Sequence, residues 1–177
     1  MKRENPLFAF ALAFALAFAG CATDYSWRSS VPVDARTVTV PTFRNESSVS
    51  EVGALASRQL LREFQREGTF KVRTSGEAAI EVQGVIKSVK PAMAAYNRRA
   101  GGRVAAYDLS ATAEISVIDK RARKVLVDNK KYTATDVFTV RQDMTTAERD
   151  ASGRVAEDLA RQIVDDLLNL NFEEKTK

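Results

Sequence analysis

Residues 107–117 read YDLSATAEISV, with apolar and polar side chains alternating without a break. Successive residues of a β-strand point to opposite faces of a sheet, so this pattern predicts a strand with one buried face and one solvated face. Residues 119–124 are charged apart from Ala122 and are expected to form a turn. Residues 125–140 are a second run rich in β-branched side chains. Together the two runs predict a long antiparallel hairpin.

Two further strands are predicted upstream of this hairpin. Residues 78–90 alternate again, and Pro91 is expected to end the strand because proline cannot donate a hydrogen bond to a sheet. Residues 92–102 are then expected to form a flexible connection. A shorter β-branched strand is predicted over residues 36–40, and a polar turn follows it.

Two stretches have apolar residues at helical spacing. The first begins at the capping box Ser48-x-x-Glu51 and ends at Gly68, and the second begins at Thr145-x-x-Glu148 and runs for about 25 residues. The order β-α-β-β-β-α predicts one α+β domain, in which a single antiparallel or mixed sheet of about four strands carries both helices on one face. The predicted core residues are Ile80, Val82, Ile86, Leu109 and Ile115 on the strands and Leu60, Phe64, Leu159 and Ile163 on the helices.

The first 20 residues are predicted to be a leader rather than part of the domain. Lys2 and Arg3 precede an uninterrupted apolar run over residues 7–19. This run is shorter than the roughly 20 residues of a membrane-spanning helix and is typical of a secretory signal. It closes with Ala19-Gly20-Cys21, which resembles the bacterial lipobox, where the leader is cut before the cysteine and the thiol is diacylated. The alternative is an ordinary signal peptide with an incidental cysteine.

Cys21 is therefore the predicted lipidation site, and several acyl chains at one terminus would anchor the protein stably. The predicted layout is a lipoprotein signal peptide over 1–20, a lipidated tether over 21–35, the domain over 36–172 and a polar tail over 173–177. In lipobox proteins an aspartate after the cysteine typically signals retention in the inner membrane. Here Ala22 takes that place, which favours the periplasmic face of the cell outer membrane.

The composition excludes several classes of enzyme. The chain has no histidine, which removes Ser-His and Cys-His nucleophile pairs and histidine-ligated zinc. Its single cysteine excludes an internal disulfide and a multi-thiolate metal site. No catalytic residue, metal or cofactor is predicted, and the protein is not expected to be an enzyme.

Positive charge is concentrated in residues 86–131, which carry 11 basic and 4 acidic side chains, a net charge of +7. Such a cluster is either a solvated strand edge or a site that binds an anion. Nucleic acid is not an expected partner on the periplasmic side, where lipopolysaccharide supplies lipid A phosphates. Arginine suits bidentate phosphate contact. The candidate anion-binding residues are Arg98, Arg99, Arg103, Lys130 and Lys131.

Several motifs occur in a recognisable order along the chain. Residues 38–47 have the form V-x-V-P-x-F-x-N-x-[ST], and residues 78–86 have the form A-x-x-x-x-x-G-x-I. The alternating strand that begins at Tyr107 and a C-terminal helix follow them. With the lipidated cysteine, this order resembles the LptE family of lipopolysaccharide-assembly lipoproteins.

The resemblance implies a non-enzymatic role. Such a lipoprotein plugs the lumen of the outer-membrane β-barrel translocon and assists the delivery of lipopolysaccharide. The implied partners are the barrel subunit, lipopolysaccharide and the membrane through the lipid anchor. A second class remains open, because outer-membrane lipoproteins that activate a cell-wall (peptidoglycan) synthase by docking begin with a similar strand, I/V-A-V-x-x-F-x-N-x-[ST].

Overall fold

The computed structural model describes residues 31–74, 77–97, 103–140, 143–170 and 172. The N-terminal half contains a short 3-10 helix η1 (Val33–Ala35), strands β1 (Thr37–Thr39) and β2 (Arg44–Asn45), helix α2 (Val52–Glu67) and strand β3 (Lys71–Val72). The remainder contains β4 (Ile80–Asn97), β5 (Arg103–Asp119), β6 (Lys124–Phe138) and helix α3 (Met144–Leu168). Within these ranges no helix combines the length and the hydrophobicity that a membrane crossing requires.

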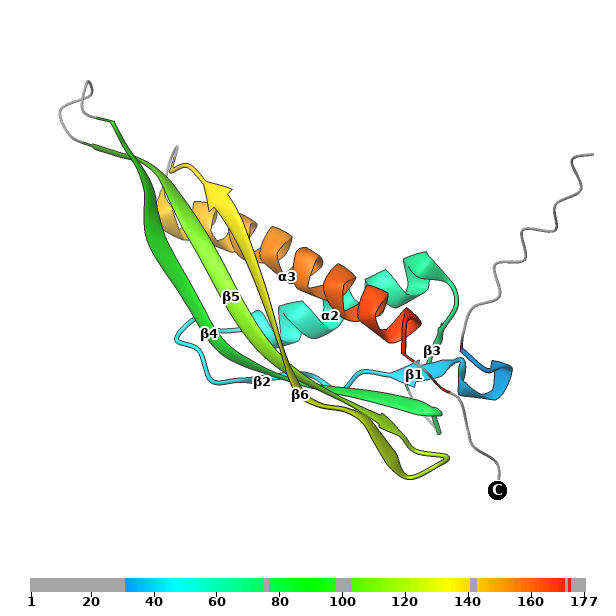
Figure 1. The fold of residues 1–177 in the computed structure, drawn as a ribbon. Coiled ribbons are helices and arrows are strands. Elements are labelled where there is room, and N and C mark those ends of the chain that lie inside the picture. Colours follow the sequence, from blue (N-terminus) through cyan, green and yellow to red (C-terminus); the bar gives the residue numbers. More distant parts are fainter. Residues whose placement is uncertain (1–30, 75–76, 98–102, 141–142, 171, 173–177) are drawn as a thin grey trace, which may run out of the picture.

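The strands form one mixed sheet in the order β3-β1-β4-β5-β6, and β2 pairs separately with β4. The three short strands pair in parallel, whereas β4, β5 and β6 form an antiparallel meander. Both helices lie on the same side of this sheet (Figure 1). The predicted α+β class is confirmed, but the sheet has six strands and not about four.

The two strands that the sequence did not predict are β2 and β3, each only two residues long. Two residues cannot display an alternating pattern, so they give no periodic signal. Backbone hydrogen bonds to distant segments define them instead: the amide of Lys71 donates to the carbonyl of Arg36 over 2.7 Å, and the amide of Glu46 donates to the carbonyl of Ile86 over 2.9 Å.

The expectation that Pro91 ends its strand is wrong. β4 continues through Pro91, which pairs with Leu109 of β5, to Asn97. On its other side β4 pairs with β1 and β2 only up to Ile86, so the later half of β4 is an edge strand. A proline is tolerated there because no neighbouring strand needs its missing N–H.

The predicted capping boxes are also wrong, although the helices themselves are confirmed. Glu51 precedes α2 in a left-handed conformation (φ 64°) with no side-chain cap, and α3 is capped by Asp143, whose carboxylate accepts a 2.7 Å hydrogen bond from the amide of Thr146. The predicted end of α2 at Gly68 is confirmed. Gly68 has φ 85°, and its amide donates to the carbonyl of Phe64 over 3.1 Å.

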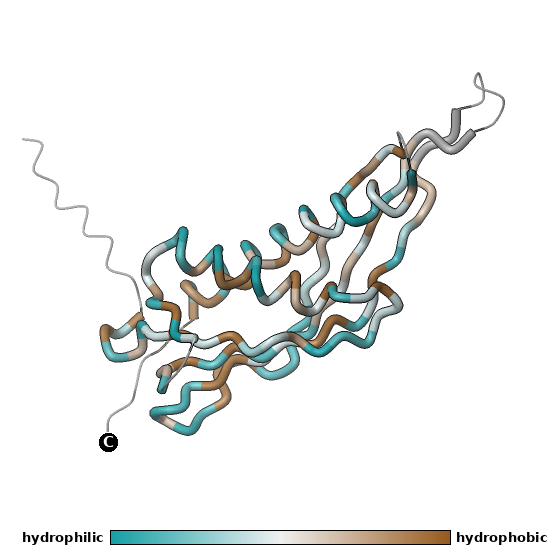
Figure 2. The backbone as a smooth tube through the Cα atoms, turned by 180° about the vertical axis from the view of Figure 1, so that it is seen from behind, coloured by the Kyte–Doolittle hydropathy of each residue, from teal (hydrophilic) through white to brown (hydrophobic). Residues whose placement is uncertain are grey.

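The core lies between the helices and the covered face of the sheet. Hydrophobic and hydrophilic residues alternate along the strands and helices, as expected for elements with one buried side (Figure 2). All nine predicted core residues belong to one buried cluster. The fully buried large side chains include Phe64, Leu60, Ile80, Ile86, Leu109, Ile115 and Ile163.

The buried cluster also reaches into the predicted tether. Val31 and Ala35 are almost fully buried, so the last residues assigned to the tether are already part of the folded domain. The leader, Cys21, Ala22, Tyr25, Trp27 and the tail over 173–177 lie outside the described residues.

Candidate functional site

An arm formed by the far ends of β4 and β5 is the most prominent feature of the molecule. Tyr107 is the last β5 residue paired with β6, through Phe138, whereas β4 and β5 continue as a two-stranded ribbon to the Asn97–Arg103 pair. We define the arm as residues 94–97 and 103–106. In Figure 1 it projects beyond the ends of β6 and α3. Its only sheet contacts in the described part of the chain are between its own two strands.

Stacked aromatic rings stabilise the base of the arm. Tyr107 and Phe138 lie with ring centroids 5.5 Å apart and planes inclined by 21°. Met93, opposite Tyr107 in the strand register, is 69% exposed. The arm therefore starts from a well-packed pair of rings and then loses its contact with β6.

The three candidate arginines belong to this arm or to its connection. Arg103 is the first residue of β5, and Arg98 and Arg99 directly follow the last residue of β4. Arg98 and Arg99 lie outside the described residues, and so does the side chain of Arg103. Of the three, only the backbone of Arg103 is described, and it lies at the end of the β4–β5 ribbon.

The two candidate lysines lie far from Arg103 along the sheet. Lys130 pairs with Ile115 of β5, twelve residues along the strand from Arg103, which corresponds to about 40 Å. Lys130 and Lys131 also point to opposite faces, because neighbouring strand residues alternate. Residues 86–131 thus do not form a single basic patch, and their charge is distributed along the whole length of the sheet.

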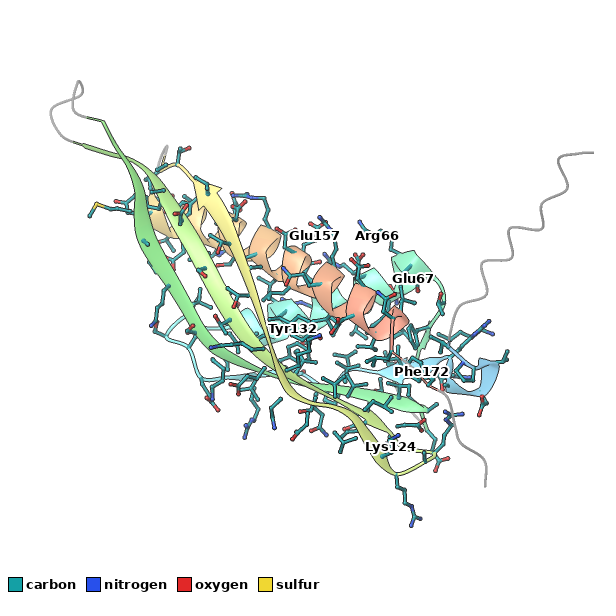
Figure 3. All side chains as sticks on the ribbon, in the orientation of Figure 1. Arg66, Glu67, Lys124, Tyr132, Glu157 and Phe172 are labelled. Atoms are coloured by element: carbon teal, nitrogen blue, oxygen red, sulfur yellow. The ribbon has the colours of Figure 1, made fainter. Side chains whose placement is uncertain are left out.

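Lys130 belongs to a polar cluster that joins β6 to α3. Its ammonium group and the hydroxyl of Tyr132 both donate to the same carboxylate oxygen of Asp166, and the ammonium nitrogen lies 5.5 Å from the centre of the Tyr132 ring. In Figure 3 Tyr132 lies on the helix side of β6. The alternation of β6 places Lys131 on the uncovered face, opposite Glu114.

The cluster shifts the pKa of two of its members. Burial, assisted by the hydrogen bond to the Asp166 carboxylate, raises the pKa of Tyr132 above its ordinary value. Burial opposes ionisation of Asp166, but the hydrogen bonds from Lys130 and Tyr132 outweigh it and lower the pKa of that carboxyl. Sequence reasoning missed Asp166, because nothing in the helix pattern indicates its contact with a strand 34 and 36 residues away.

The raised pKa of Tyr132 predicts a stability change at alkaline pH. Folding favours the neutral phenol, so this contribution is complete below the ordinary value of 10.0 and is lost as the pH rises toward the folded-state pKa. The free-energy difference between wild type and Tyr132→Phe should stay constant from about pH 7 to pH 9 and shrink above about pH 10. Urea unfolding of both proteins across this pH range measures the free-energy difference. A difference that stays constant at alkaline pH would contradict the raised pKa of Tyr132.

The uncovered face of the sheet is rich in hydroxyl groups. Thr112 and Thr133 are cross-strand neighbours with hydroxyl oxygens 3.3 Å apart, and the Ser116 hydroxyl accepts a 3.0 Å hydrogen bond from the amide of Asn129. Lys87 forms ion pairs with Glu46 (2.5 Å) and Glu114 (3.8 Å). The uncovered face therefore carries polar side chains that already have partners within the sheet. We call this surface the hydroxyl face; its hydroxyl-bearing residues are Ser110, Thr112, Ser116, Thr133 and Thr135.

The most specific sequence motif has a structural role. The ring of Phe43 lies over Gly84, where an added Cβ would be 2.6 Å from ring carbons. The Asn45 amide donates to the carbonyl of Val49 over 2.7 Å, and its oxygen accepts from the amide and the hydroxyl of Ser47. The phenylalanine, asparagine and serine of one motif and the glycine of the other thus shape the turn before α2 and its fit against β4.

An open pocket lies at the N-terminal ends of α2 and α3. Its lining combines Arg58 and Arg149 with Glu51 and Glu148, so these charged side chains balance one another. The pocket therefore favours no particular charge in a ligand. Among the described residues there is also no group of three or more acidic, cysteine or histidine side chains placed to hold a metal ion.

Comparison with solved structures places the fold among bacterial proteins. A hypothetical protein from Chlamydia trachomatis, 13% identical, aligns over 77% of this chain and 97% of its own with a TM-score of 0.54. A protein from Xanthomonas campestris, 10% identical, aligns over 75% of this chain and 83% of its own with a TM-score of 0.51. At these identities the likeness shows the fold alone.

Comparison of sequences identifies the family. None of the curated protein sequences matches the chain significantly. The family model for LptE, described as lipopolysaccharide-assembly, matches residues 35–167, from η1 to the last turn of α3. This span includes both quoted motifs, the arm, the hydroxyl face and both helices. The chain therefore belongs to the LptE family of lipopolysaccharide-assembly proteins.

Proposed function

We propose that this protein is an outer-membrane lipoprotein that serves as the accessory subunit of the β-barrel lipopolysaccharide translocon and assists lipopolysaccharide transport and assembly. The observation that carries the proposal is the match of the LptE family over residues 35–167. The role implied by the family is non-enzymatic. The protein would act through its surfaces, and no catalytic residue or cofactor is assigned to it.

Cys21 supplies the membrane attachment in this proposal. The apolar run over residues 7–19 and the lipobox-like Ala19-Gly20-Cys21 support it, as does the absence of any other thiol in the chain. Acylation would hold the domain at the periplasmic face of the outer membrane. Mass spectrometry of the mature N-terminal peptide tests the anchor, and a free thiol on Cys21 would contradict it.

The arm is the part of the molecule that we assign to lipopolysaccharide. Arg98, Arg99 and Arg103 lie close together in the sequence, next to the end of a two-stranded ribbon whose described residues have no strand partner on β6 beyond Tyr107. A projecting ribbon can reach a ligand without disturbing the core. Guanidinium groups bind the phosphates of lipid A through paired N–H donors. Lys131, exposed on the uncovered face, is a secondary candidate, whereas Lys130 already forms an ion pair with Asp166.

The hydroxyl face is the surface that we assign to the barrel wall. Thr112 and Thr133 contact each other through their hydroxyl groups, and the Ser116 hydroxyl accepts from the amide of Asn129, so several of its polar groups already have partners within the sheet. The opposite face of the sheet is covered by α2 and α3 and is not available to a partner. A polar face that is already self-paired fits a water-filled lumen lined by polar side chains.

Reversal of the arm charges tests the lipopolysaccharide assignment. Each exposed ion pair contributes only about 0–1 kcal/mol, so single substitutions should have little effect. The triple variant Arg98→Glu, Arg99→Glu and Arg103→Glu is expected to abolish salt-sensitive capture of lipopolysaccharide by the purified protein. The attraction should weaken as salt rises, since the Debye length falls from about 10 Å at 0.1 M to about 3 Å at 1 M.

The matched control reverses three arginines on the helices, Arg58→Glu, Arg62→Glu and Arg149→Glu, and changes the net charge equally. Equal capture of lipopolysaccharide by wild type and the arm variant would contradict the assignment and would mean that the arm arginines are only a solvated edge. Purification of the wild type from membranes in mild detergent then identifies the partner. Recovery of a cell-wall synthase in place of a β-barrel would support the alternative role.

A further inference from the structure

The strand ends opposite the arm meet in one row across the sheet. Lys71 of β3 pairs with Thr37 of β1, and the next β1 residue, Val38, pairs with Ile80 of β4. Asp119 of β5 pairs with Ile80 on one side and with Lys124 of β6 on the other. This row spans five strands, or about 19 Å. Segments from four distant parts of the sequence therefore share one end of the sheet.

This end brings together basic side chains from three separate segments of the sequence, beside the acidic Asp34, Glu81 and Asp119. We call it the basic end; its basic residues are Arg36, Lys71, Arg73, Lys120, Arg121, Arg123 and Lys124. Lys120 forms an ion pair with Glu81 (3.2 Å), and Arg121 with Asp119 (2.7 Å). Within the described residues the other five have no carboxylate partner. Figure 3 shows Lys124 at the β5–β6 hairpin that closes this end.

Two exposed apolar side chains lie beside these charges. Val33 of η1 is 80% exposed and Val125 of β6 is 53% exposed. Val33 precedes Asp34, which contacts Arg121 of the hairpin, and Val125 follows Lys124. Basic side chains next to exposed apolar ones are typical of protein surfaces that rest on lipid headgroups.

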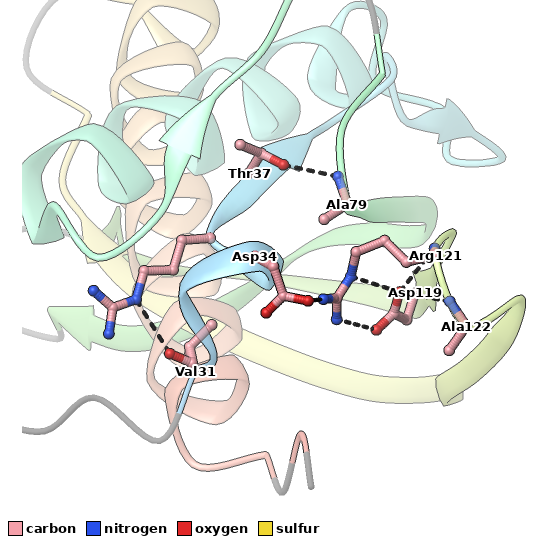
Figure 4. A network of polar contacts seen from close by, with 8 residues as sticks. Val31, Asp34, Thr37, Ala79, Asp119, Arg121 and Ala122 are labelled. Atoms are coloured by element: carbon pink, nitrogen blue, oxygen red, sulfur yellow. Dashed lines mark hydrogen bonds and ion pairs between the residues drawn. The ribbon is translucent and has the colours of Figure 1, made fainter. Parts of the chain in front are cut away.

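A network of polar contacts links the N-terminal segment to the basic end (Figure 4). Asp119, only 5% exposed, accepts hydrogen bonds from the side chain of Arg121 and from the amides of Arg121 and Ala122. Arg121 also pairs with Asp34, and Arg36 donates a 3.1 Å hydrogen bond to the carbonyl of Val31. Val31, the first described residue, therefore lies at this end of the domain.

We propose that the basic end rests on an anionic phospholipid surface in the leaflet that holds the anchor. The inference depends on the lipid anchor proposed above for its geometry: the ten Cα–Cα steps from Cys21 to Val31 can span at most about 35 Å. The basic side chains that have no carboxylate partner among the described residues supply charge complementarity to anionic headgroups. The arm lies at the other end of β4 and stays free for its own partner.

Vesicle binding tests this contact directly. The protein without leader residues 1–20 and with Cys21→Ser is mixed with vesicles of phosphatidylcholine, with or without phosphatidylglycerol, and sedimented. We expect binding only to the vesicles with phosphatidylglycerol, and the binding should weaken as salt rises. Arg123→Glu with Lys124→Glu should lower the partition coefficient at least about tenfold, since each basic side chain near such a surface contributes about fivefold.

Two further pairs separate a local contact from general attraction. Lys71→Glu with Arg73→Glu changes β3 and the residue that directly follows it. This pair should lower the partition coefficient by a similar factor, and it tests the proposal even if the hairpin variant misfolds. Arg58→Glu with Arg149→Glu, toward the N-terminal ends of the helices, changes the net charge equally and should alter the partition less than about twofold. An equal loss in this control pair would overturn the proposal.

The vesicle experiment can fail or succeed independently of the lipopolysaccharide-capture experiment that tests the proposed function. The vesicles contain neither lipopolysaccharide nor a barrel, so failure of lipopolysaccharide capture by the arm leaves this test intact. Absence of binding to phosphatidylglycerol vesicles would overturn the proposal. Loss of lipopolysaccharide capture in the hairpin variant, with no vesicle binding by wild type, would instead assign the basic end to lipid A phosphates.

Discussion

Leu159→Ala is expected to lower the free energy of unfolding by about 2–5 kcal/mol, the range observed for leucine truncation at fully buried sites. Leu159 is 3% exposed on the inner face of α3. It lines a small void between the helices and the sheet together with Ile86 and Leu109. Removal of its side chain would enlarge this void, and the surrounding rigid strands and helices limit how far it can collapse. Urea unfolding measures the change.

A control for this substitution is Leu61→Ala on α2, where the side chain is only half-buried. Its loss of stability should be less than about half of that at Leu159, because less apolar area leaves water when it folds. A loss well under 1 kcal/mol at Leu159 would mean that α3 does not dock on the sheet as described.

Gly53→Ala is expected to destabilise the protein by about 1–3 kcal/mol, although alanine is the better helix former. Gly53 lies in the first turn of α2, where an added Cβ would be 2.4 Å from the carbonyl oxygen of Phe43 and 3.4 Å from the Cβ of Asn45. Backbone atoms of the turn would have to move away from α2. The cost of that shift should exceed the gain in helix propensity.

Gly153→Ala provides the matched control within α3. An added Cβ there meets nothing within 4 Å, so the ordinary preference of alanine for helices should stabilise the protein by about 0.5–1 kcal/mol. Thermal or urea unfolding of both variants measures the change in the free energy of unfolding, which should fall for Gly53→Ala and rise for Gly153→Ala. A stabilising Gly53→Ala would show that α2 does not approach the turn as closely as described.

Local patterns in the sequence predicted the long elements well. The alternation over residues 107–117 and the two apolar stripes at helical spacing are properties of neighbouring residues, and they predicted β5, α2 and α3. The core followed from the same patterns, because the side of an element that is apolar is the side that packs. The resemblance to the LptE family rested on motifs that now have structural roles around Phe43, Asn45 and Gly84.

Predictions that depended on context were less accurate. Pro91 does not end β4 because the strand is an edge at that point, which only the sheet order reveals. The capping boxes had suitable residue types, but Asp143 caps α3 and a left-handed Glu51 precedes α2. Short polar side chains can cap a helix from several neighbouring positions, and the path of the preceding chain selects one of them.

The leader and the lipidation of its single thiol stay predictions from the sequence. By itself the sequence determined the fold class, the two helices, the three long strands and the absence of histidine chemistry. These follow from periodicity and composition, which are local or global properties of the chain. The tertiary structure alone decided where the charges lie: it separated Arg103 from Lys130 by about 40 Å and joined Lys130 to Asp166. It also gathered Lys71, Arg121 and Lys124 at the end of the sheet where the N-terminal segment enters. Strand register and ion pairs link residues tens of positions apart, and no local pattern encodes which distant partner a charged side chain will meet.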